Sequence, residues 1–156
     1  TVTASTYKEA SWAKPPARFE GGLGNFSGMM ATGAAIDYLS KIEMDQVKEH
    51  EIRLNRIMTK GVKDLPGLKI IGPEDPAKRG GICSIIMDKL PAHDVAILLD
   101  EAAGVMVRSG QHCVHSWFEH HGHKQGSLRA SAYFYNTEEE VKRFVDTLTE
   151  IVHTLG

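Results

Sequence analysis

The sequence predicts an α+β fold: a two-layer sandwich in which helices pack on a short, mainly antiparallel sheet of three or four strands. Three observations predict it. Short apolar runs are bounded by glycine, proline and polar residues, as strands are, and longer segments carry an apolar stripe at helical spacing. The length of 156 residues suits one domain, and such a chain buries about 70% of the surface that its unfolded form exposes.

The apolar periodicity places the expected elements in order along the chain. Helices are expected over residues 28–39, 44–63 and 94–103 and after residue 137, and strands over residues 68–71, 82–87, 105–108 and 128–133. Ser27 is the expected cap of the first helix, Gly104 ends the third, and Thr137 opens a capping box with Glu140. Residues 1–17, with two consecutive prolines, are expected to run extended, and residues 109–127 to form a loop with one helical turn near Trp117.

Composition excludes several classes of protein. The formal net charge of −2 argues against a nucleic-acid binder with a basic face and against a polybasic membrane anchor. No run of 18 apolar residues and no signal-peptide pattern is present, so we expect neither a membrane nor a secretory location. The two cysteines, Cys83 and Cys113, are too few for a disulfide scaffold, and a reducing, cytoplasmic compartment is expected.

Cys113 is the strongest candidate for chemistry. It follows the apolar run 105–107 in a polar segment with Arg108 and His112, and positive neighbours favour the thiolate, which is the reactive form. Cys83 lies inside an apolar strand and is expected to pack in the core. Arg129 begins a strand, where the residues alone predict no more than a surface salt bridge.

Histidines crowd the same segment. Together with Cys113 they form a group that could bind zinc: His112, His115, His120, His121 and His123. Their spacing matches no standard zinc signature, so no metal is predicted. Trp117 and Phe118 are expected to anchor this loop.

Four motifs, read together, resemble a known family. They are RFEGG at 18–22, PAHDV at 91–95, RSGQHC at 108–113 and RASAYFYNTEE at 129–139. In order and spacing they are similar to the C-terminal part of a SufS-type cysteine desulfurase, a pyridoxal 5'-phosphate (PLP) enzyme of the class V aminotransferase family. The resemblance covers essentially the whole chain.

The resemblance implies an organisation in two parts. Residues 1–40 would be the end of the large domain of a fold-type I PLP enzyme, with the glycine-rich turn, and residues 41–156 the small domain with the cysteine loop. The cofactor lysine would lie in an N-terminal large domain outside these residues. The chain alone is therefore expected to bind no PLP and to be inactive, whereas the full-length enzyme would be a homodimer with PLP.

The resemblance also assigns roles. Cys113 matches the residue that takes sulfur from L-cysteine as a persulfide, leaving L-alanine, and passes it to a sulfur-acceptor protein for iron-sulfur cluster assembly or other sulfur transfer. Arg129 matches the arginine that binds the substrate carboxylate, and Arg108 and His112 match positions beside the substrate. The turn residues Gly22, Leu23 and Gly24 match a segment that approaches the cofactor phosphate of the partner subunit, although Leu23 replaces a common hydroxyl residue.

Two alternatives stay open from the sequence. Selenocysteine lyases and other class V aminotransferase-fold enzymes share much of this motif order, and their substrates differ. The chain could also be a non-catalytic sulfur-carrier or docking module, in which Cys113 accepts a persulfide without any cofactor.

Overall fold

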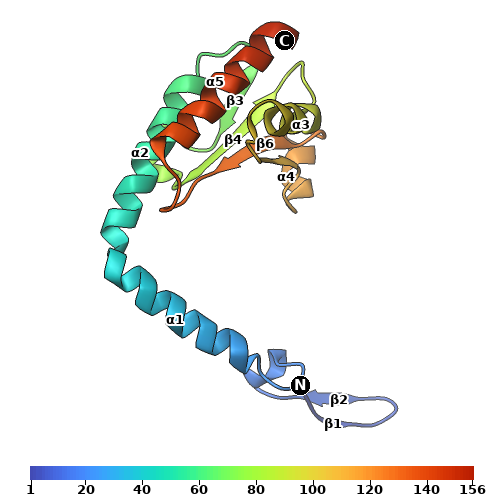
Figure 1. Ribbon diagram of the computed structural model, residues 1–156. Helices are drawn as coiled ribbons and strands as arrows, with labels where there is room; N and C mark the ends of the chain where they lie inside the picture. The colour runs from blue at the N-terminus through green and yellow to red at the C-terminus, as the bar shows by residue number, and fades with distance from the viewer. The chain divides into compact units, whose positions relative to one another are not determined.

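The computed structural model describes residues 1–156, and the chain divides into two units, Thr1–Glu43 and Met44–Gly156. Figure 1 shows the elements of both. No helix is both long enough and apolar enough to cross a membrane.

The first unit consists of a hairpin, one 3-10 turn and one helix. Strands β1 (Val2–Ser5) and β2 (Ala10–Trp12) pair antiparallel, followed by η1 (Ala17–Phe19) and α1 (Phe26–Ile42). The hairpin was not expected from the sequence, because its two strands are short and lack apolar alternation. No side chain of this unit is buried, so nothing within it covers the apolar side chains of α1.

The start of α1 differs from the expected one. Asn25, and not Ser27, is the N-cap, because its Oδ1 accepts a hydrogen bond of 2.9 Å from the Gly28 N–H. The helix therefore begins two residues earlier than expected, at Phe26, and it continues to Ile42.

The second unit is the predicted two-layer α+β sandwich. Its order is α2 (Met44–Val62), β3 (Leu68–Ile71), η2 (Pro76–Lys78), β4 (Ile82–Met87), α3 (Ala92–Ala103), β5 (Arg108–Gly110), α4 (His115–His120), β6 (Ser127–Ser131) and α5 (Glu138–Leu155). The four strands form one antiparallel sheet in the order β3-β4-β6-β5. Helix α5 packs against α2 and α3, which in turn contact β4 and β6.

The core lies between these helices and one face of the sheet. The alternation of side chains along a strand directs every second residue of β4 and β6 towards the helices. Cys83, Ile85, Leu128 and Ala130 are the buried strand residues, and they meet an apolar stripe of α2, α3 and α5 that includes Leu54, Leu99 and Leu148. The opposite residues of β6, Ser127 and Arg129, therefore lie on the other face of the sheet.

The third strand is shorter and later than the sequence predicted. Strand β5 covers Arg108–Gly110, whereas the apolar residues 105–107 were expected to pair. Gly104, with a φ of 63°, ends α3, and the Val105 N–H donates back to the Leu99 carbonyl. Val105 and Val107 then pack against the core without a strand partner, so their apolar character reflects burial and not pairing.

The capping box that begins α5 supplies a stability prediction. Thr137 accepts the Glu140 N–H, and the Glu140 carboxylate accepts the Thr137 N–H at 2.9 Å, a bond that lowers the pKa of Glu140. We expect Thr137→Ala to lower the free energy of unfolding by about 1 kcal/mol in urea denaturation. Thr147→Ala in the same helix is the control: it removes no cap and is expected to cost less. Equal losses would contradict the prediction.

Candidate functional site

Two arginines face each other on the side of the sheet opposite the helices. Arg108 of β5 and Arg129 of β6 are directly paired residues, so their side chains lie on the same face. Ser84 of β4 flanks Arg129 on its other side. Two like charges in opposite positions destabilise a sheet. No carboxylate lies within ion-pair distance of either guanidinium to offset that repulsion. This arrangement is suited to an anionic ligand.

Arg129 has unused hydrogen-bonding capacity. Its side chain is half-buried, and its Nε atom is shielded from solvent without any hydrogen-bond partner. A shielded donor that lacks a partner costs free energy, so Arg129 is held in place at a cost to stability. Arg108 is more exposed than Arg129.

Cys113 is exposed on a tight turn just beyond β5. The Val114 N–H donates to the Gln111 carbonyl at 2.9 Å, and the two residues between them, His112 and Cys113, have positive φ angles of 48° and 62°. Helix α4 begins directly afterwards, at His115. The turn therefore places the thiol where other molecules can reach it.

The other thiol is inaccessible. Cys83 is fully buried in β4, as predicted, and burial raises its pKa to about 11 in spite of the nearby Arg79. A thiol of that pKa holds almost no thiolate at neutral pH, so Cys113 is the one candidate nucleophilic cysteine.

His112 lies beside the arginine pair. Its Nε2 is 3.0 Å from the Ser127 hydroxyl oxygen, and its ring contacts that of Phe118. Burial lowers its pKa from the ordinary 6.5; the charges of Arg129 and Arg108 lower it further, and hydrogen bonding to Ser127 opposes them. The structure thus brings Arg108, Arg129 and His112 together, with Cys113 next in the chain.

The lowered pKa of His112 gives a pH prediction. The His112 imidazole binds a proton less tightly in the folded state than in the unfolded state. The contribution of His112 to the free energy of unfolding is therefore present above pH 6.5 and is lost as the pH falls below that value. We expect a ¹H-NMR titration to place the His112 midpoint below 6.5. Arg129→Gln should move that midpoint upwards, because one repelling charge is gone, whereas Arg56→Gln on α2 should not. An unchanged midpoint in Arg129→Gln would contradict the assignment.

Two of the remaining loop histidines, His120 and His121, make ring contacts. Trp117 stacks on His121 with ring centroids 4.2 Å apart, and Phe118 is buried and anchors the loop. No group of three or more histidine, cysteine, aspartate or glutamate side chains is placed to hold a metal ion.

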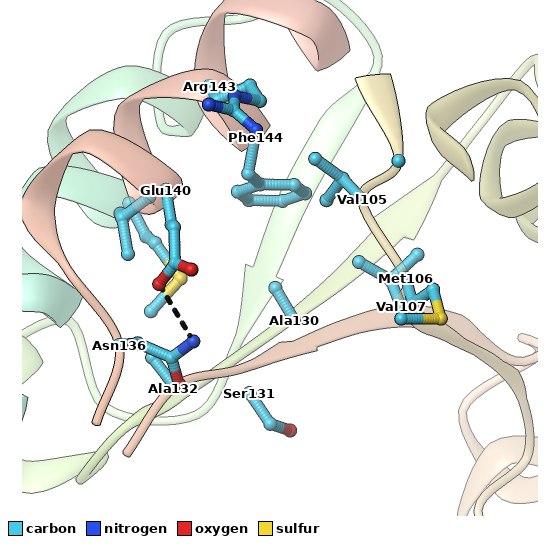
Figure 2. A pocket seen from close by; sticks show the side chains of 13 residues that line it. Val105, Met106, Val107, Ala130, Ser131, Ala132, Asn136, Glu140, Arg143 and Phe144 are labelled. Carbon is cyan, nitrogen blue, oxygen red and sulfur yellow. Dashed lines mark hydrogen bonds between the residues drawn. The ribbon is translucent and has the colours of Figure 1, made fainter. Parts of the chain in front are cut away.

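A pocket of about 260 Å³ lies elsewhere in this unit (Figure 2). Val105, Ala130 and Phe144 form part of its wall, and Asn136 donates to the Glu140 carboxylate at its edge. None of the predicted site residues lines it. Ala130 faces the helices while its neighbour Arg129 faces away, so the pocket and the arginine pair lie on opposite faces of the sheet.

The glycine turn of the first unit is open. Gly21 and Gly22 have nothing within 4 Å of where a Cβ would stand, and Gly22 has a φ of 148° that side chains rarely adopt. The N–H groups of Gly22, Leu23 and Gly24 make no hydrogen bond within the chain. These free donors, just before the N-terminus of α1, fit a phosphate group brought by another molecule.

Ser127 is the site residue that sequence reasoning missed. It is fully buried on the arginine face and fixes His112, yet a serine at the start of a strand carries no signal of either property. Only the folding of the 111–126 loop back over β6 brings the two side chains together.

The fold is that of a family of PLP enzymes. The chain belongs to the aminotransferase class-V family, whose model matches residues 1–144. Enzymes of this family depend on PLP in general.

Among its relatives are cysteine desulfurases, which confirms the resemblance. It is 37% identical over 142 residues to a "Probable cysteine desulfurase" of Xylella fastidiosa (91% of this chain, 33% of that protein). It is also 37% identical over 154 residues to the "Cysteine desulfurase" of Salmonella newport (99% of this chain, 37% of that protein). The chain thus spans about a third of the length of these curated relatives.

Solved structures of cysteine desulfurases have the same fold as this chain. The apo cysteine desulfurase of Thermococcus onnurineus NA1 superimposes with a TM-score of 0.80 at 33% identity, over 99% of this chain and 38% of that one. The cysteine desulfurase CsdA of Escherichia coli gives a TM-score of 0.78 at 22% identity, over 99% of this chain and 37% of that one, which supports the fold.

Proposed function

We propose that this chain is the C-terminal part of a PLP-dependent cysteine desulfurase that converts L-cysteine to L-alanine and carries the sulfur as a persulfide on Cys113. Residues 1–40 are the end of the large domain and residues 41–156 the small domain. The observation that carries the proposal is the half-buried, partly unsatisfied Arg129, paired with Arg108 and free of any carboxylate, beside the turn that exposes Cys113.

Arg129 binds the substrate carboxylate in this proposal. A guanidinium presents a planar fork of donors that grips both oxygens of a carboxylate, and no carboxylate of this chain forms an ion pair with it. Arg108 adds positive charge to the same face, which draws the anionic end of the amino acid towards β6.

Cys113 takes the sulfur. Its thiolate attacks the substrate's sulfur atom, so that a sulfur–sulfur bond forms as the carbon–sulfur bond of the substrate breaks. PLP, when bound, supplies the electron sink for the pair left on the substrate carbon. Because the thiol stands on an exposed turn, the resulting persulfide is open to a sulfur-acceptor protein.

The residues of this chain fit PLP only at its phosphate. The free N–H groups of Gly22, Leu23 and Gly24 would hold the phosphate of the partner subunit's cofactor in a homodimer, and Leu23 offers no hydroxyl to add a further bond. The lysine that anchors the cofactor belongs to the N-terminal large domain. We therefore expect the 156-residue chain by itself to produce no alanine from L-cysteine.

The test uses the full-length enzyme that contains these residues. Incubated with L-cysteine, it should release L-alanine, and a peptide containing Cys113 should gain about 32 Da, the mass of one sulfur atom. Alanine formation without a Cys113 adduct would favour a lyase that does not use this thiol. An adduct formed on the 156-residue chain from a persulfide donor, with no alanine from the full-length protein, would instead favour a sulfur carrier.

A further inference from the structure

The Cys113 turn has a backbone that its own residues disfavour. His112 and Cys113 are the two central residues of a turn closed by the Val114 N–H and the Gln111 carbonyl, and both have positive φ angles. Turns with two such residues strongly prefer Asn-Gly, Asp-Gly or Gly-Gly, because a Cβ atom is strained in the left-handed region. Neither histidine nor cysteine relieves that strain, so contacts outside the turn must hold it.

Two hydrogen bonds tie this turn to the rest of the loop and the sheet. The His112 Nε2 lies 3.0 Å from the Ser127 hydroxyl oxygen, and the Gln111 side-chain amide donates to the Lys124 carbonyl at 2.7 Å. The bond to Ser127 is made by His112, which is one of the two strained residues. It also reaches a rigid part of the molecule, because Ser127 belongs to β6 and is 0% exposed.

The support beneath His112 cannot easily move. Ser127 pairs with Gly110 across the sheet, and a Cβ on the preceding Gly126 would come within 2.3 Å of the Gly110 backbone. On the other side, the His112 ring lies 6.2 Å from the ring of Phe118, which is 3% exposed. The imidazole therefore has neighbours on both β6 and helix α4.

We propose that His112 is a positioning residue: its bond to Ser127 holds the left-handed turn and so fixes the direction in which Cys113 presents its thiol. This role rests on the proposed function: His112 directs the Cys113 thiolate towards the substrate's sulfur atom. Since displacement of a reacting group by about 1 Å can cost on the order of 100-fold in rate, a small backbone change at this turn matters.

Glycine and alanine at position 112 separate this role from others. Both remove the imidazole, but glycine adopts a positive φ freely and alanine does not. In the full-length enzyme we expect His112→Ala to lower kcat by about 10- to 100-fold with KM for L-cysteine within about twofold. His112→Gly should keep several times more activity than His112→Ala. His115→Ala, in the same loop, should leave kcat unchanged.

Ser127 supplies the matching pair of variants. Ser127→Ala should lower kcat about as much as His112→Ala does. Ser127→Thr keeps the hydroxyl, so its kcat should be close to that of the unsubstituted enzyme. In the His112→Gly background, Ser127→Ala should have no further effect, because the bond is already absent. Equal losses in His112→Gly and His112→Ala, or a fully active Ser127→Ala, would overturn the proposal and assign the imidazole itself to the chemistry or to no role.

A structural readout is independent of the reaction. In the 156-residue chain, NMR coupling constants and Cα shifts at Cys113 should report a positive φ in the unsubstituted protein and in Ser127→Thr, and its loss in Ser127→Ala. A positive φ that persists in Ser127→Ala overturns the positioning role. If the full-length enzyme forms no persulfide at all, the proposed function fails, while this measurement still decides whether the bond holds the turn.

Discussion

Cys113→Ala is expected to abolish cysteine desulfuration by the full-length enzyme, with a loss of kcat/KM on the order of 1000-fold or more. The physical reason is that the exposed thiol is the atom that receives the sulfur, and alanine offers no electron pair in its place. Alanine release and the mass of the peptide containing Cys113 measure the effect. The substrate should still bind, because Arg129 is untouched.

Cys83→Ala is the matched control for that experiment. Cys83 is fully buried in β4, so its replacement leaves the catalytic face intact and costs about 1 kcal/mol of stability through a small cavity. Near-normal turnover of cysteine by Cys113→Ala would contradict the role of Cys113. A persulfide found on Cys83 would contradict its inaccessibility.

Arg129→Leu is expected to raise KM for L-cysteine by about 10- to 100-fold. Charge-assisted hydrogen bonds contribute about 1.5–3 kcal/mol each, and this substitution removes the fork that would hold the carboxylate. The substitution should not lower the unfolding temperature, because Arg129 has no ion-pair partner to lose and its charge repels that of Arg108. Steady-state kinetics and the unfolding temperature together check both halves of the prediction.

Two further variants make the Arg129 result specific. Arg129→Lys keeps the charge but loses the planar fork, so KM should lie between those of the unsubstituted and Leu enzymes. Arg56→Leu, on the exposed side of α2, should leave KM unchanged. If Arg129→Leu instead lowers the unfolding temperature with an unchanged KM, the arginine has a structural role and carboxylate binding is refuted.

Strong local signals made much of the fold predictable. The apolar stripes of α2 and α5, the apolar strand β4 and the capping box at Thr137 depend on residues close in sequence, and the structure has them where they were expected. The errors came where a local signal had two meanings. Residues 105–107 were expected to pair because they are apolar, but Val105 and Val107 pack against the core beside the sheet and Met106 is exposed.

The candidate site, like the fold, was predictable from the sequence only in part. The sequence by itself determined which residues carry chemical groups: one thiol in a polar loop, arginines near it, and a motif order that belongs to the class V aminotransferases. Tertiary structure alone decided that Arg108 stands opposite Arg129 and that Ser127 lies buried beside His112. Strand register and the packing of the loop on the sheet depend on contacts between residues far apart in the chain, and no local pattern encodes them.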